Sequence, residues 1–149
     1  MSENEKKENE YVRDVMIEQN SLDIEWLQQP RLYTKWAERK AIAEDKVRIC
    51  KEKIKVIDAT IARDVRSRDD IKITESLVKE LTELDPRHQE ALQKLNDAEY
   101  EVDMMDVAVK GMDHKKSALE NLVKLWQGSY FAGPKEPVDI NRDPYGNKD

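Results

Sequence analysis

The sequence has little of what builds sheets, disulfide frameworks or membrane spans. Among its 149 residues are one cysteine, one phenylalanine and four glycines, at positions 111, 128, 133 and 146. The single cysteine, Cys50, excludes an intrachain disulfide and is typical of a reducing compartment. Four scattered glycines cannot form a phosphate-binding glycine loop. No run approaches the roughly 20 apolar residues of a membrane span. The polar start MSENEKKENE predicts no signal peptide, so we expect a soluble, cytoplasmic protein without a membrane.

Charge is what the sequence has in excess, at 39% of residues and a net −6. With so few glycines, this composition favours long solvated helices and an all-α fold. One stretch keeps an unbroken spacing of three and four residues, which is typical of a helix seam packed on other helices. The seam positions are Leu95, Ala98, Val102, Met105, Val109, Met112, Lys116, Leu119, Val123 and Trp126.

A helix carrying this seam would be roughly 60 Å long at ~1.5 Å per residue, too long for a compact domain with a radius of gyration near ~15 Å. The seam must therefore pack on another long helix or on further copies of the chain. Lys116 is a polar residue in this otherwise apolar seam. Such a residue would fix the helix register or the oligomeric state. Alternatively, its aliphatic stem would pack in the seam while its charged end reaches water.

Turn and capping signals divide the chain. Apolar anchors before Pro30 predict a short ordered element, a turn and a short helix from Ser21, and Pro30 suits the first turn of a new helix. Asp85 and Pro86 suit the N-cap and first position of the long helix, and Gly128 its end. The predicted units are a disordered N-terminus 1–10, a helical domain 11–128 with helices 31–66, 74–84 and 86–127, and a flexible tail 129–149.

These helices predict a long antiparallel helical hairpin with a small N-terminal helical element. A two-helix hairpin leaves apolar area on its outer faces, which favours a homo-oligomer assembled through the helix seams. We therefore assign the oligomer seam to Leu95, Val102, Met105, Val109, Met112, Leu119, Val123 and Trp126.

The net negative charge hides a basic segment. Residues 31–68 contain twelve Lys and Arg against six Asp and Glu, a local balance of +6. Cations beside aromatic rings suit single-stranded nucleic acid, because cations follow the phosphates and rings stack on bases. A solvated face whose charges pair with the acidic helix explains the same composition equally well. The candidate DNA-binding residues are Tyr33, Lys35, Trp36, Arg39, Lys40, Lys46, Arg48, Lys51, Lys53, Lys55, Arg63, Arg66 and Arg68.

The sequence offers no set of catalytic or metal-binding residues. His88 and His114 lie 26 positions apart, without companions at metal-ligand spacing. The carboxylates around Asp103 and Asp106 are what a charge-rich helix produces by chance, and Cys50 is a small hydrophobe at a seam position. We therefore expect no enzyme, no metal and no cofactor.

Two stretches resemble the UvsY family of phage recombination mediator proteins. The first runs from Asp14-Val15-Met16-Ile17 to Leu32-Tyr33-Thr34-Lys35-Trp36, where L-Y-T-K-W opens the basic helix. The second is LDPRHQEALQKLNDAEYEVDMMDVAVKGMDHKKSALENLVKLW followed by GSYFAGP. Together they cover about two-thirds of the chain. The segment Ile57-Asp58-Ala59-Thr60-Ile61-Ala62-Arg63 carries fewer basic residues than the family pattern, and the chain is acidic overall.

The resemblance implies a non-enzymatic, ring-like homo-oligomer, from hexamer to octamer, that binds single-stranded DNA. Such a mediator helps a RecA-like recombinase displace the single-strand DNA-binding protein and form a filament. The basic helix would then contact the phosphates, and the C-terminal helix would assemble the ring. The alternative is a structural or adaptor coiled-coil protein, such as a virion component or assembly chaperone, without DNA binding.

Overall fold

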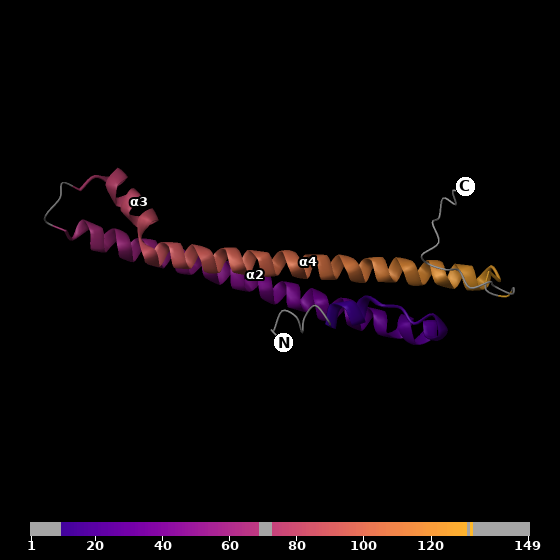
Figure 1. Ribbon diagram of the computed structural model, residues 1–149. Coiled ribbons are helices and arrows are strands. Elements are labelled where there is room, and N and C mark those ends of the chain that lie inside the picture. The colour runs from indigo at the N-terminus through magenta and orange to yellow at the C-terminus, as the bar shows by residue number, and fades with distance from the viewer. Residues whose placement is uncertain (1–9, 69–72, 131, 133–149) are drawn as a thin grey trace, which may run out of the picture.

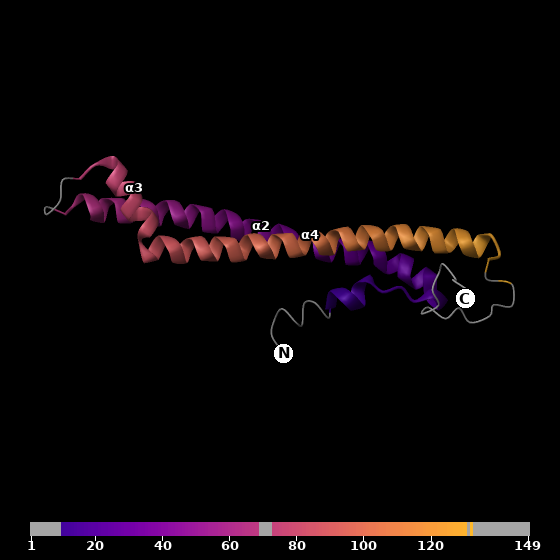
Figure 2. The same ribbon diagram turned by 45° about the horizontal axis from the view of Figure 1, so that its top comes forward.

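The protein is a long helical hairpin with a small helix at one end. The computed structural model describes residues 10–68, 73–130 and 132, and within these residues all regular secondary structure is helical. The order is a helical segment 10–15, η1 (Gln19–Ser21), α2 (Leu22–Arg66), α3 (Glu75–Leu84) and α4 (Pro86–Gln127). Helices α2 and α4 run side by side along most of their length, with α3 at their junction (Figures 1 and 2). The predicted all-α helical hairpin is confirmed.

Local capping signals place the ends of α3 and α4. The Thr74 side chain accepts a hydrogen bond from the Leu77 N–H at 3.3 Å and caps α3. The Asp85 carboxylate accepts the Arg87 N–H at 2.8 Å, and Pro86 occupies the first position of α4. Helices α3 and α4 thus begin and end where the sequence signals place them. The expected disorder before residue 10 and most of the expected tail lie outside the described residues.

The prediction that a new helix begins at Pro30 is wrong. Helix α2 begins at Leu22 and continues through Pro30. The proline removes one helical hydrogen bond, but tertiary contacts hold the preceding turns against α4. The buried Gln29 amide donates to the Met112 carbonyl oxygen at 2.6 Å, and Glu25 forms an ion pair with Lys115 at 2.8 Å. These contacts decide the continuity of α2, and they are not visible in the local sequence.

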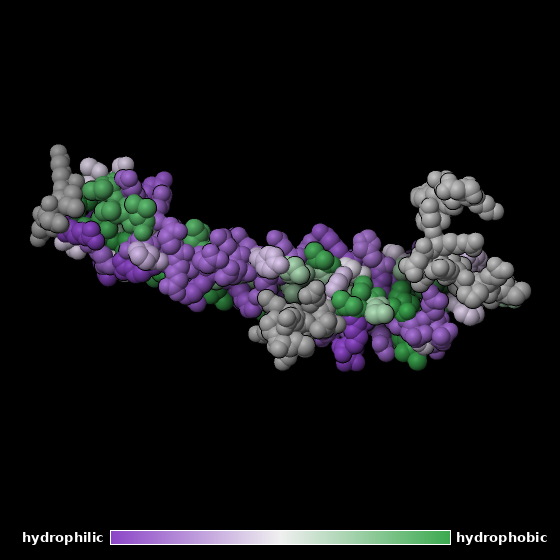
Figure 3. All heavy atoms as spheres, in the orientation of Figure 1, coloured by the Kyte–Doolittle hydropathy of each residue, from purple (hydrophilic) through white to green (hydrophobic). Residues whose placement is uncertain are grey.

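Two hydrophobic clusters hold the hairpin, one in its middle and one at the α3 end. The first gathers the buried residues Trp36, Ala43, Met105, Ala108 and Met112, with Tyr11, Val15, Leu32, Val102 and Val109 packed around them. The second gathers Ile61, Val65 and Val78, with Ile57, Ala62, Ile73 and Leu81 around them. On the face shown in Figure 3, hydrophobic residues gather over α3 and toward the opposite end, with mostly hydrophilic residues between them.

The predicted seam of α4 packs largely within the chain. Met105, Met112 and Leu119 are buried inside the hairpin, whereas Trp126 is 51% exposed. The placement of Lys116 in the seam is wrong, because Lys116 is exposed and Lys115 is buried. The buried series Met105, Ala108, Met112, Lys115 and Leu119 also has a three-and-four spacing. That the seam also joins copies of the chain remains a prediction.

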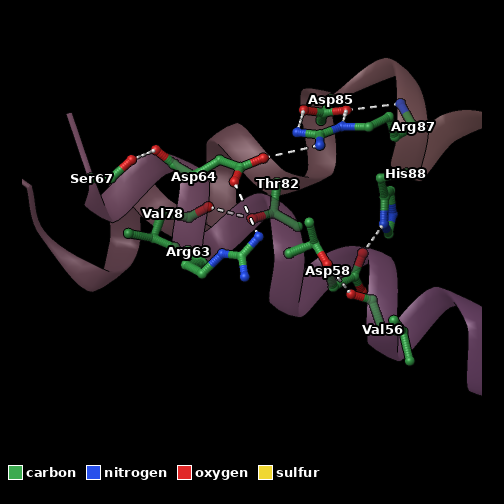
Figure 4. A network of polar contacts seen from close by, with 11 residues as sticks. Val56, Asp58, Arg63, Asp64, Ser67, Val78, Thr82, Asp85, Arg87 and His88 are labelled. Atoms are coloured by element: carbon green, nitrogen blue, oxygen red, sulfur yellow. Dashed lines mark hydrogen bonds and ion pairs between the residues drawn. The ribbon is translucent and has the colours of Figure 1, made fainter.

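A polar network fastens the α3 end of the hairpin. Arg87, in the first turn of α4, contacts Asp85 and the Asp64 carboxylate of α2, each at 3.0 Å (Figure 4). The hydrogen bonds to Asp85 and Asp64 raise the pKa of Arg87. The next residue, His88, has its Nδ1 2.7 Å from the Asp58 carboxylate. These contacts cross from α4 to α2 and so fix the register of the two helices.

Candidate nucleic-acid interface

Several of the basic residues on α2 pair with the acidic helix α4. Lys40 reaches Asp106 at 2.7 Å, Lys46 reaches Glu101 at 2.9 Å, and Lys51 reaches Glu99 at 3.1 Å. Hydrogen bonds from Lys110 and from Lys40, with their charges, lower the pKa of Asp106 to about 2. The same hydrogen bond with Asp106 raises the pKa of Lys40. These cations serve the α2–α4 contact in this conformation, as the solvated-face interpretation expects.

Residues 10–18, which we call the N-terminal strap, cover the start of the basic segment. Glu10 accepts two hydrogen bonds from the Arg39 guanidinium, at 3.0 and 3.2 Å, and lies 2.6 Å from Lys35 Nζ. Hydrogen bonds from Arg39 and Lys35 lower the pKa of Glu10 to about 2. Asp14 pairs with Lys35 and accepts the Trp36 Nε1–H at 3.2 Å.

The strap also buries the aromatic residue that the sequence analysis assigned to base stacking. The Tyr11 ring meets the Trp36 ring edge-on, with centroids 5.8 Å apart, and Trp36 is only 1% exposed. The Arg39 guanidinium lies 4.7 Å from the Trp36 ring centroid. Lys35, Trp36 and Arg39 therefore form one cation–aromatic cluster, and in this conformation the strap occupies it.

A second set of cations faces outward from α2. Arg48 and Lys55 lie seven residues apart and share one face, and Lys53 is also exposed. The Arg48 side chain is 76% exposed and pairs only within its own helix, with Asp45, among the described residues. Lys53 and Lys55 form no ion pair within the part of the chain that the structure describes. Among the described residues, Arg48, Lys53 and Lys55 are therefore exposed cations that pair with neither α4 nor the strap.

The remaining predicted residues lie toward the two ends of α2. Tyr33 is 40% exposed near the start of the helix. At the other end, Arg66 pairs with Glu75 of α3 at 2.9 Å, and the Arg63 side chain is 79% exposed. Arg68 lies close enough to Asp85 to add, after Arg87, to the lowering of that carboxyl pKa. The predicted set is thus distributed over the whole helix and does not form one site.

Two apolar stripes run along one side of the hairpin. Ile42, Ile49 and Val56 are 61%, 43% and 66% exposed and lie seven residues apart on α2. On α4, Tyr100, Met104 and Val107 are 64%, 45% and 56% exposed. The Lys46–Glu101 ion pair lies one helical turn from members of each stripe, so both stripes border the same side. Ile49 and Val56 also line an open depression, together with Arg48, Glu52, Lys53 and Ile57.

No protein-family model and no curated protein matches the chain. Among solved structures, the crystal structure of the bacteriophage T4 recombination mediator protein UvsY is similar, with a TM-score of 0.71 and 16% sequence identity. The match covers 89% of this chain and 100% of that chain. The chain has the UvsY fold. A match of that extent includes most of both long helices, α2 and α4.

A metal-binding cluster and a membrane-spanning helix are both absent from the described residues. No group of three or more His, Cys, Asp or Glu side chains there is placed to hold a metal ion. In the same part of the chain, no helix combines the length and hydropathy that crossing a membrane requires.

Lys115 and Glu25, polar residues that dock the strap, were not among the residues predicted from the sequence. Buried Lys115 donates to the carbonyl oxygens of Asp14 and Met16, at 2.9 and 2.8 Å, and pairs with Glu25. Burial raises the pKa of Glu25, but the Lys115 and Glu18 hydrogen bonds and the Lys115 charge bring it below its ordinary value. The available signal was the second three-and-four series on α4, which places Lys115 on the buried side.

Proposed function

We propose that the protein is a non-enzymatic recombination mediator that binds single-stranded DNA as a homo-oligomer. It would promote loading of a RecA-like recombinase onto DNA coated with single-strand-binding protein. The observation that carries the proposal is the UvsY fold over 89% of the chain. The exposed cations Arg48, Lys53 and Lys55 of α2 would supply phosphate contacts that such a fold needs.

Assembly explains how a net-acidic chain would hold DNA. Within its described residues one subunit presents only a few unpaired cations, and charge steering from so few is weak. A ring of subunits repeats the cationic face and converts weak single contacts into avidity. The stripes containing Ile49 and Tyr100 leave apolar area on one side of the hairpin, and we propose that a neighbouring copy covers it.

The first experiment measures binding of a fluorescently labelled single-stranded oligonucleotide by anisotropy, from low to physiological salt. The test variant carries Arg48→Gln, Lys53→Gln and Lys55→Gln, and none of these cations pairs with α4 among the described residues. Loss of three phosphate contacts should weaken binding. It should also reduce the salt slope, the dependence of log K on log salt concentration, by about 2, at ~0.7 per contact. If the unmodified protein shows no binding at low salt, the proposal is wrong.

The matched control removes the same charge from the other helix. Lys110→Gln, Lys116→Gln and Lys124→Gln also lower the net charge by three, and these lysines are exposed on α4. If the two triple variants lose affinity equally, binding depends on net charge and not on the α2 face. Light scattering on each variant checks that the oligomer mass is unchanged.

The mediator role has its own assay. Recombinase filament formation on oligonucleotide precoated with single-strand-binding protein should be slow alone and faster when the protein is added. The α2 triple variant should stimulate filament formation less than the α4 triple variant. If the protein binds DNA but does not stimulate filament formation, it is a DNA-binding protein and the mediator assignment is wrong.

A structural or adaptor protein without DNA binding is the second candidate. The observation that favours it is the pairing of Lys40, Lys46 and Lys51 with acidic residues of α4. In that case neutralising exposed lysines should change stability or assembly and leave no DNA affinity to lose. The low-salt anisotropy measurement separates the two candidates.

A further inference from the structure

The N-terminal strap places a carboxylate where a phosphate would bind. Glu10 lies 2.6 Å from Lys35 Nζ and accepts a paired hydrogen bond from the two terminal nitrogens of Arg39. Arginine binds carboxylate and phosphate with the same two-pronged geometry. The cations lie beside the Trp36 ring, with Lys35 Nζ 5.3 Å from its centroid. Two cations on an aromatic ring are the elements of a single-stranded nucleic acid site.

We propose that the strap is an internal competitor for nucleic acid, so that Glu10 holds the Lys35–Arg39 site until DNA phosphate replaces it. This inference rests on the proposed DNA-binding function and adds a regulated site to the exposed cations of α2. Release of the strap would free both cations and uncover Trp36, which is 1% exposed in the docked arrangement. The protein would then have a closed state with fewer DNA contacts and an open state with more.

The attachment of the strap suits such an exchange. The strap is one short helical segment, residues 10–15, followed by non-helical residues 16–18 and by η1. Beyond the Glu10 and Asp14 contacts with α2, it is held by Lys115 through the carbonyl oxygens of Asp14 and Met16. Tyr11 and Val15 pack on the Trp36 cluster, and the Glu18 N–H donates to Glu25. The cluster of Ile61, Val65 and Val78 at the far end of the hairpin does not involve the strap. Undocking therefore leaves that half of the hairpin intact.

A single substitution tests the competition. Glu10→Gln keeps the size of the side chain and removes the charge that Arg39 and Lys35 bind. Its control, Glu38→Gln, also removes one negative charge, from the part of α2 next to Arg39. Glu38 is exposed with no ion pair among the described residues. Comparing these two variants separates release of the site from the general effect of a less acidic chain.

The expected result is tighter oligonucleotide binding by Glu10→Gln than by Glu38→Gln at low salt. Lys35 keeps its ion pair with Asp14, so Glu10→Gln frees Arg39 alone. One freed cation at ~0.7 should steepen the salt slope by about 0.7, a roughly 2.6-fold larger loss of affinity between ~50 and ~200 mM salt. Equal affinity and equal slope in the two variants would overturn the inference and leave the proposed function standing. No binding by any variant at low salt would remove the function and the inference together.

A charge-neutral variant gives a second, independent test. Lys115→Met with Glu25→Gln removes one positive and one negative charge and loosens the strap from α4 without changing a cation of α2. It should raise DNA affinity, and Trp36 should become more accessible to a neutral fluorescence quencher before DNA is added. Greater quencher access without a gain in affinity would overturn the competition, and so would unchanged access together with unchanged affinity. Circular dichroism at the assay temperature confirms that each variant is folded.

Discussion

Lys115 offers a sharp test of how the hairpin holds its N-terminal strap. Its side chain is 2% exposed, and its ammonium group contacts three oxygens: the Asp14 and Met16 carbonyls and the Glu25 carboxylate, at 2.8 to 2.9 Å. Glu25 is itself only 14% exposed. Lys115→Met removes the charge from this buried group and leaves the Glu25 carboxylate without its cation. Breaking a buried ion pair from one side costs about 3–5 kcal/mol.

The double substitution separates the two parts of that cost. With Glu25→Gln added, no charge is stranded, and the remaining penalty is that of the two carbonyl groups that lose a donor. Unsatisfied buried groups cost about 1–3 kcal/mol, so the double variant should be more stable than Lys115→Met alone. A coupling free energy near 2 kcal/mol between the two positions is expected, within the range for contacting residues.

The neighbouring lysine is the control. Lys116 is one residue away, 58% exposed, and its ion pair with Glu120 spans 3.9 Å. Lys116→Met should change stability by less than about 0.5 kcal/mol, as exposed ion pairs do. Urea unfolding followed by circular dichroism, at one protein concentration for all variants because association shifts stability, measures the set. Equal losses for Lys115→Met and Lys116→Met would refute the buried placement of Lys115.

Three further outcomes follow from other contacts. Gly111→Ala should change stability by less than about 1 kcal/mol. Helix propensity gains up to ~1 kcal/mol, while the new Cβ would overlap the Tyr11 hydroxyl and lie 3.1 Å from two of its ring carbons, so the ring must turn aside. Urea unfolding measures the change, and a large loss would show that the ring cannot move. The pKa values of Glu10 and Asp106 fall from 4.5 and 3.8 to about 2, so their stabilisation should be fully present above pH ~4.5 and disappear toward pH ~2. The midpoint pH of acid unfolding, followed by circular dichroism, should differ between Glu10→Gln and the unmodified protein. Identical curves would contradict the contribution of Glu10. Ile49→Asp, at a 43% exposed position, should lower the mass found by light scattering with helix content unchanged, and an unchanged mass would remove that stripe from the assembly.

Local signals were enough to determine most of the fold. Charge-rich composition with few glycines requires solvated helices, and the caps at Thr74 and Asp85 act on the nearest backbone N–H groups. Such signals operate within one turn, so the helix ends they mark can be found in the sequence alone. The apolar periodicities of α2 and α4 likewise predict that these two long helices pack together, as the structure confirms.

The candidate site was less accessible to sequence reasoning, because the same basic residues serve two purposes. Composition identifies the basic helix, but it does not distinguish Lys51, paired with Glu99, from Lys55, which has no ion pair among the described residues. It also placed Trp36 among exposed stacking residues, whereas the ring is in the core beneath Tyr11. Ion pairing and ring burial depend on residues far apart in the chain.

The sequence by itself determined that this chain forms long amphipathic helices, where α3 and α4 begin and end, and that basic charge is concentrated in residues 31–68. The tertiary structure alone decided that α2 passes through Pro30, that Lys115 and not Lys116 is buried, and that the strap occupies the Lys35–Arg39 cluster. The physical reason is that all three depend on contacts between segments far apart in the chain. Gln29 and Glu25 of α2 bond to Met112 and Lys115 of α4, and Lys115 bonds to strap carbonyl oxygens. No periodicity within one helix records partners supplied by another segment.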